Sequence, residues 1–196
     1  MMLQAVRREK KCRVCPTRFV PTRPLQVACC PDCAQTLARR NREKAEKRAA
    51  TIEKQKTRAA LEALKTVPQL MAEADRAFCA YIRARDKAAG HPCISSGLPL
   101  DWSGNNVDAG HYRSRGAASH LRYNELNCHA QAKRENRYKG GNVVEYRAHL
   151  IQRIGLEAVK ALEQDSRTHK WTRDELREIR DTYRKKLREL LKARKV

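Results

Sequence analysis

Five cysteines near the start of the chain constrain its fold more than any other feature. A CxxC pair is followed 14 residues later by the run CCPDC. Two such turns can present four thiolates to one ion, and a tetrahedral set of thiolates is typical of a structural zinc site. The candidate ligands are Cys12, Cys15, Cys33 and either Cys29 or Cys30. Because few apolar residues surround them, we expect residues 1–33 to form a zinc knot that needs the metal to fold.

The charge of the chain points to a polyanionic partner. The 196 residues include 43 Lys and Arg against 22 Asp and Glu, which gives a net charge of +21. The excess is +11 over residues 1–66, +3 over 67–165 and +7 over 166–196. This distribution predicts basic flanks that bind nucleic-acid phosphates around a more specific middle segment. The length allows one modest core with appendages.

We expect neither a membrane partner nor a secreted protein. No stretch approaches the roughly 20 apolar residues of a membrane helix, and the first residues lack the apolar core of a signal peptide. The sequence therefore predicts a cytoplasmic protein.

Long helices are expected to flank the middle segment. Residues 34–66 contain no Gly or Pro and carry a thin, alanine-rich apolar stripe, which predicts a long basic helix that is solvated or packed on a partner. Residues 67–165 are predicted to hold the core, and 166–196 a basic helix that begins with the capping box Thr172 to Glu175. A homodimer is expected, because the stripe of the long helix and that of Leu176–Leu190 exceed what a small core can cover.

The middle segment loses the helical period after residue 92. We expect short strands or loops up to about Tyr123, a helix that starts near His129, and a further helical stretch over 143–163 that is broken at Gly155. The same segment gathers His, Asn and Asp side chains in an otherwise basic chain. These are the groups of an HNH-type, or ββα-metal, nuclease, which needs an imidazole to deprotonate water and ligands for one divalent ion.

The chain resembles the lambdoid phage NinG family, also called Rap. The resemblance covers nearly the whole chain and is carried by DAGHYRSRGAASHLRYNELN, by NRYKGGNVVEYRAHLIQRIGLEAVKALE, by the cysteine knot and by the final HKWT segment. It implies a mostly helical protein with a small HNH-like core, in the cytoplasm of the phage's host. It also implies a structure-specific DNA endonuclease that cleaves Holliday junctions and D-loops with Mg²⁺ or Mn²⁺. The alternative is a non-catalytic protein that binds branched or single-stranded DNA.

The resemblance assigns roles to individual residues. His111 is expected to be the general base and Asn127 the amide that orients it, while Asp108 and Asn136 are expected to hold the catalytic ion, with His129 as a further ligand. In the N-terminal knot, the resemblance favours Cys29 over Cys30. The arginines and lysine expected to contact DNA phosphates are Arg39, Arg40, Arg42, Arg113, Arg115, Arg122, Arg134, Arg137 and Lys139.

The chain departs from the family pattern at a second zinc clip. Where the family has two CxxC pairs around the central motif, this chain reads CISS over 93–96 and AKRE over 132–135, so that three of four thiolates are missing. We therefore expect one zinc ion per chain. Apolar packing is expected to replace the clip, by Leu98, Trp102, Tyr123, Leu126 and Tyr138.

Overall fold

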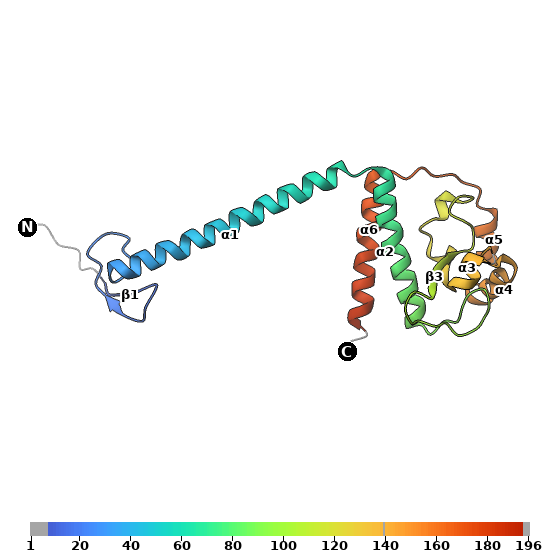
Figure 1. Cartoon of the computed structure of the whole chain (residues 1–196), viewed down its shortest axis with the longest axis horizontal. Helices are drawn as coiled ribbons and strands as arrows, with labels where there is room; N and C mark the ends of the chain where they lie inside the picture. Colours follow the sequence, from blue (N-terminus) through green and yellow to red (C-terminus); the bar gives the residue numbers. More distant parts are fainter. Residues whose placement is uncertain (1–7, 139, 194–196) are drawn as a thin grey trace, which may run out of the picture. The chain divides into compact units, whose positions relative to one another are not determined.

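The computed structural model describes residues 8–138, without the side chain of Tyr138, and residues 140–193. The chain divides into two compact units, of which the first ends at Leu64 and the second begins at Lys65 (Figure 1). Both are mostly helical, with a two-stranded antiparallel sheet in each. No described helix is long and apolar enough to cross a membrane.

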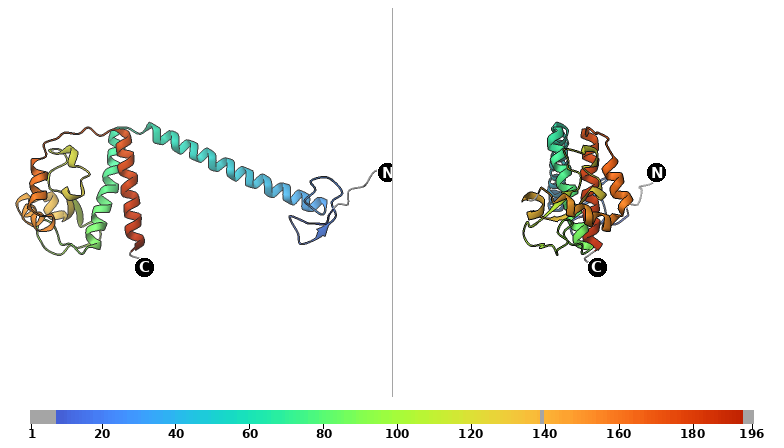
Figure 2. Two further views of the ribbon diagram at one scale, coloured as in Figure 1. Left: turned by 180° about the vertical axis from the view of Figure 1, so that it is seen from behind. Right: turned by 90° about the vertical axis from the view of Figure 1, so that its right-hand side faces the viewer.

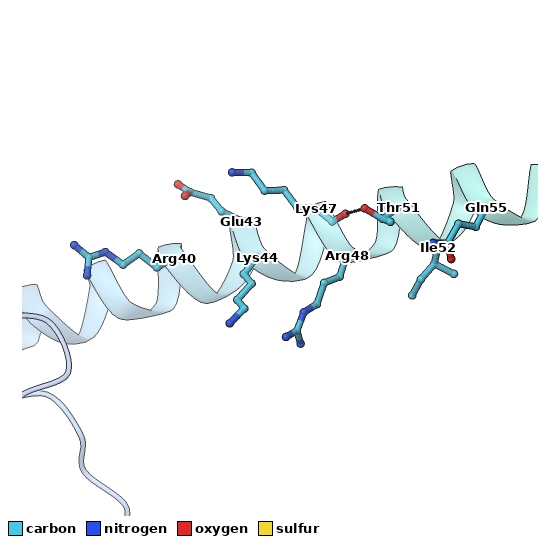
Figure 3. Close-up of a pocket in the computed structure, with 8 residues that line it drawn as sticks. All are labelled: Arg40, Glu43, Lys44, Lys47, Arg48, Thr51, Ile52 and Gln55. Carbon is cyan, nitrogen blue, oxygen red and sulfur yellow. Dashed lines mark hydrogen bonds between the residues drawn. The ribbon is translucent and has the colours of Figure 1, made fainter. Parts of the chain in front are cut away.

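The first unit is a small knot followed by one helix. Strand β1 (Lys10–Lys11) pairs with β2 (Arg18–Phe19), and α1 runs over Pro31–Leu64. Pro31 suits the first position of a helix because its missing N–H would have no helical partner there. None of the described side chains of α1 is buried. Figure 3 shows Arg40, Lys44, Lys47 and Arg48 extending outward from this helix.

The second unit is built on a pair of helices. Helix α2 (Val67–Ala88) begins after Thr66, which forms a capping box with Gln69. It packs along α6 (Arg173–Ala193), as Figure 2 shows. The shared core holds Leu70, Ala74, Phe78, Ile82, Leu176 and Tyr183. The apolar stripe of α6 therefore faces α2, and our expectation that it would cover a dimer contact was wrong.

A ββα unit lies on the other side of α2 (Figure 1). Strand β3 (Val107–His111) pairs antiparallel with β4 (Cys128–Ala132), and α3 (Lys133–Tyr138) follows β4 directly. Two 3-10 turns, η1 (Ser119–Leu121) and η2 (Glu125–Asn127), connect the strands.

The prediction of a helix starting near His129 was wrong. The segment CHAQA contains no β-branched residue, so the sequence gives little local preference for a strand. It becomes a strand because its backbone pairs with β3 and its first four residues are buried.

Two short helices cover the far end of this unit. They are α4 (Val143–Ile154) and α5 (Leu156–Gln164). Gly155 separates them as expected, with φ at 87°, a conformation that glycine adopts at little cost. Tyr146, Leu150, Val159 and Leu162 pack against Ile94 in a second apolar cluster.

Candidate functional site

The four cysteines of the N-terminal knot have the geometry of a zinc site. Their Sγ atoms all lie within 4.8 Å of one another, and three of the separations are 3.5, 3.7 and 3.8 Å. Four sulfurs about 2.3 Å from a central zinc would be about 3.8 Å apart. The set is Cys12, Cys15, Cys29 and Cys33. Cys30 is exposed and stands outside it, so the structure selects Cys29 from the two possibilities.

Main-chain amides support the first sulfur of the knot. The amide of Val14 donates to Cys12 Sγ at 3.4 Å. Hydrogen bonds from the amides of Cys15 and Val14 lower the pKa of Cys12 to about 6. The thiolate form, which is the metal-binding form, is therefore favoured at this ligand.

The second unit contains a cavity of 570 Å³ beside the ββα unit. Strand β3, the loop after it, α2, α3 and the glycines beyond α3 all contribute to its wall. The lining residues are Cys79, Arg83, Asp108, Ala109, His111, Ser114, Arg115, Asn136, Arg137, Gly140 and Gly141. Three of the residues predicted for catalysis and cation binding, Asp108, His111 and Asn136, thus share one cavity with Arg115 and Arg137, two of the predicted phosphate contacts.

Asp108 and Asn136 are in direct contact. The Nδ2 atom of Asn136 donates to Asp108 Oδ2 at 3.0 Å, and Arg137 Nε donates to the same oxygen at 3.1 Å. A side-chain amide can turn to present its oxygen instead. A carboxylate and an amide oxygen at this spacing are ligands that Mg²⁺ and Mn²⁺ accept, so the pair fits a divalent cation.

His111 has a defined tautomer. Its Nε2 atom lies 2.8 Å from the main-chain oxygen of Arg122, which can only accept a hydrogen bond, so Nε2 carries the proton. The Nδ1 atom keeps its lone pair and lies 3.7 Å from Cys128 Sγ. Burial of the ring lowers the pKa of His111, which favours the neutral imidazole that a general base requires.

Asn127 fixes the loops around His111 through hydrogen bonds to their backbone, and its described bonds do not include the imidazole ring. Its Oδ1 atom accepts from the amide of Arg113 at 2.8 Å, and its Nδ2 atom donates to the carbonyl oxygens of Arg113 and Leu121 at 3.0 and 3.2 Å. Leu121 precedes Arg122, whose carbonyl accepts from His111. The oriented imidazole therefore depends on Asn127 through the backbone.

The structure does not bring His129 to the cavity. Its side chain is buried, and its Nδ1 atom lies 3.3 Å from the hydroxyl of Tyr146. Burial lowers the pKa of His129 to about 3. His129 is not among the residues that line the cavity with Asp108 and Asn136.

The predicted phosphate contacts fall into two groups. Arg113 donates to the carbonyl oxygens of Leu162 and Glu163, and Arg122 forms a bidentate pair with Asp75, so both guanidinium groups are engaged within the unit. The exposed or partly exposed group consists of Arg39, Arg40, Arg42, Arg115, Arg134 and Arg137. Lys139 lies outside the described residues.

Helix α2 supplies side chains that the sequence reasoning missed. Cys79 and Arg83 line the cavity, and Asp75 binds both Arg122 and Arg115. The three residues are four positions apart, which places them on one face of the helix. The recurrence of Asp75, Cys79 and Arg83 at every fourth position of α2 is the sequence signal that could have identified them.

Hydrogen bonds join residues 93–96 to β4 and to Gly141, in the region where no second zinc clip was expected. Cys93 Sγ accepts from the amide of Ala132 at 3.3 Å. Ser95 Oγ and Gln131 Nε2 both donate to the carbonyl oxygen of Gly141, at 3.0 and 2.7 Å. Of the residues expected to pack here, Tyr123 is buried in the core, whereas Leu98 and Leu126 are 65% and 48% exposed. The side chain of Tyr138 lies outside the described part of the chain.

Comparisons with known proteins agree over nearly the whole chain. The family model described as "Bacteriophage Lambda NinG protein" matches residues 4–193. Curated relatives called "Protein ninG" include that of Escherichia phage 933W, 39% identical across 94% of this chain and 95% of the relative. That of Escherichia phage lambda is 38% identical across 99% and 98%, and that of Salmonella phage P22 is 37% identical across 98% of each. No solved structure matches.

Proposed function

We propose, since the chain belongs to the NinG family of lambdoid phage proteins, that it is a metal-dependent endonuclease of branched DNA. Its substrates on this proposal are Holliday junctions and D-loops. The observation that carries the proposal is the ββα unit that gathers Asp108, His111 and Asn136 around one cavity. The proposal also includes a structural zinc ion at the four cysteines and a catalytic Mg²⁺ or Mn²⁺.

The chemistry follows from the state of each side chain. His111 Nδ1, with Nε2 protonated and bonded to a carbonyl, accepts a proton from the attacking water. Asp108 and Asn136 would hold a divalent cation, whose charge would stabilise the scissile phosphate and the leaving oxygen. Arg115 and Arg137 line the same cavity and can donate to phosphate oxygens.

The basic surface supports DNA as the substrate. Arg39, Arg40 and Arg42 are exposed on α1. Together with the net charge of +21, they supply binding to phosphates that does not depend on base sequence. Specificity for a branch has to come from the second unit, where the cavity lies.

The alanine-rich face of α1 is the surface that we propose for a homodimer. Two opposed nicks in a four-way junction require two active sites, and α1 has no buried side chain among those described. Light scattering of the free chain should give the mass of a dimer, and Ile52→Glu should reduce it to a monomer. A monomer at micromolar concentration, with and without DNA, would remove this part of the proposal.

The central experiment is cleavage of a synthetic Holliday junction. His111→Ala should lower the cleavage rate about a hundredfold or more in Mg²⁺ or Mn²⁺ and leave the affinity for the junction nearly unchanged. His91→Ala is the matched control, because His91 does not line the cavity. A wild-type chain that binds the junction but leaves every strand intact in Mg²⁺, Mn²⁺ and Co²⁺ would refute the endonuclease and favour the non-catalytic alternative.

A further inference from the structure

A second hollow adjoins the candidate catalytic cavity. It measures 240 Å³ and is lined by α2 on one side and by the loop that precedes β3 on the other. We call it the side groove, and its residues are Arg83, Ala84, Lys87, Trp102, Gly104, Asn105 and Val107. Arg83 lines both hollows, so the side groove and the catalytic cavity are neighbours at this side chain.

Helix α2 lines this path with cationic groups. Arg83 and Lys87 are four residues apart, so they lie on one helix face with a rise of about 6 Å between them. Among the described residues, neither forms an ion pair. Arg85 differs, because its guanidinium pairs with Asp86 and donates to the carbonyl oxygens of Glu125 and Cys128. The side groove therefore has positive charge that the described part of the chain does not neutralise.

Trp102 supplies an aromatic face beside these cations. Its ring is partly exposed, and Lys87 Nζ lies 5.6 Å from the ring centroid. Gly104, at φ 53°, has no side chain to close the hollow, and a Cβ there would meet nothing within 4 Å. An indole face flanked by cations is the combination that binds unpaired bases together with their phosphates.

The loop that carries Trp102 is tied to the ββα unit. Asp101 accepts from the amide of Ser103 at 2.9 Å and from Asn106 Nδ2 at 2.6 Å. The carbonyl oxygen of Asn106 accepts from the amide of Lys133, the first residue of α3. These bonds hold the indole at a fixed position relative to β3 and α3, which carry Asp108 and Asn136. They also engage Asp101, the acidic residue of this loop.

We propose that the side groove binds one unpaired nucleotide of DNA next to the scissile phosphate. The base stacks on Trp102, and the phosphate beside it contacts Arg83 and Lys87. The hollow is smaller than the roughly 300–1,000 Å³ of sites for drug-sized ligands, which suits one base rather than a base pair. A D-loop or a fork offers unpaired bases next to the branch, and an intact duplex does not. The inference rests on the proposed nuclease site, which lies beside the side groove. It assigns to that site a preference for branched DNA.

The test compares forked DNA with duplex DNA of the same length. Affinities are measured by fluorescence anisotropy without added divalent cation, so that no strand is cleaved. Trp102→Ala should weaken binding to the fork about fivefold or more and leave binding to the duplex unchanged. Trp102→Phe, which keeps an aromatic face, should bind the fork within about twofold of the wild type. Lys87→Ala should weaken fork binding. It should also flatten the slope of log affinity against log salt by the amount that corresponds to about one phosphate contact.

Two outcomes would overturn the inference. One is a Trp102→Ala variant that melts like the wild type and binds the fork equally well. The other is equal weakening for fork and duplex, which would place Trp102 outside the recognition of unpaired bases. Failure of the nuclease proposal looks different, since the wild type would then cleave nothing while the fork preference still depended on Trp102.

Discussion

The Nε2 atom of His111 lies 2.8 Å from the main-chain oxygen of Arg122, and this contact links the ring to helix α2. The side chain of Arg122 donates to Asp75 through Nε and Nη2, at 2.8 and 2.5 Å. Arg115, which lines the cavity, donates to the same carboxylate at 2.9 Å. One carboxylate thus holds both the loop that orients the imidazole and a guanidinium that faces the substrate side.

Asp75→Asn should slow cleavage more than it weakens binding. The neutral amide loses the charge that fixes Arg122 and Arg115, so the carbonyl that accepts from His111 is held less firmly. We expect a fall of about tenfold in the cleavage rate, with junction affinity within about twofold, measured by single-turnover kinetics and anisotropy. Asp174→Asn, at a carboxylate that is 92% exposed, is the control and should change neither. Equal losses in affinity and rate would argue against a positioning role.

Cys29→Ser and Cys30→Ser should differ in zinc content. The wild type and Cys30→Ser should each contain one zinc ion per chain by elemental analysis. Cys29→Ser should lose the zinc, because it removes one of the four clustered sulfurs. A zinc content close to two in the wild type would contradict the predicted single ion. Retention of zinc by Cys29→Ser together with its loss from Cys30→Ser would reverse the ligand assignment.

Gly110→Ala should destabilise the second unit. A Cβ at Gly110 would lie 1.9 Å from Gln131 Oε1 and 2.9 Å from its Cδ. Gln131 is 1% exposed and donates to Gly141, so it cannot move away without breaking that bond. We expect a loss of about 1–3 kcal/mol in the free energy of unfolding, measured with denaturant. Gly116→Ala, where a Cβ meets nothing within 4 Å, should cost little.

Acid should destabilise the fold partly through His129. In the unfolded chain this imidazole takes up a proton below about pH 6.5, whereas burial keeps it neutral in the folded chain down to a pKa of about 3. The contribution of His129 to the free energy of unfolding is therefore complete above pH 6.5. It is lost as the pH falls toward 3, by at most about 1.4 kcal/mol for each pH unit. Denaturant melts from pH 7 to 4.5 should show a shallower slope for His129→Asn. An unchanged slope would show that His129 is protonated in the folded state.

The triple variant Arg39→Ala, Arg40→Ala and Arg42→Ala should affect binding and not chemistry. These exposed side chains contribute general phosphate contacts, so affinity should fall for every DNA tested, and the slope of log affinity against log salt should flatten by up to three contacts. The cleavage rate at saturating protein should remain at the wild-type value. A fall in that rate would place α1 within the catalytic machinery.

The sequence predicted what depends on local chemistry. The cysteine spacing located the knot, the Thr172 cap located the start of α6, and the DAGH motif located one wall of the cavity. Interactions distant in the sequence were not predictable in the same way. Nothing near Cys128–Ala132 specifies a strand, because the pairing partner β3 and the cover from α2 provide the stabilisation.

The candidate site shows the same division. The residue types at Asp108, His111 and Asn136 were evident from the motifs, whereas the contribution of Asp75 required the packing of α2 against the strands. His129 illustrates the converse. A histidine next to a motif suggested a ligand, but β4 is buried on both faces and the side chain of His129 lies in the interior, beside Tyr146.

The hydrogen bonds of Ser95 and Gln131 to Gly141 give the two units different vulnerabilities inside a host cell. These hydrogen bonds involve no metal ion, so neither chelation nor zinc starvation can remove them. The knot has no such protection, because oxidation of one thiolate abolishes its ligand set. With the zinc site that we propose, loss of the ion would therefore unfold the knot while the cavity of the second unit keeps its shape.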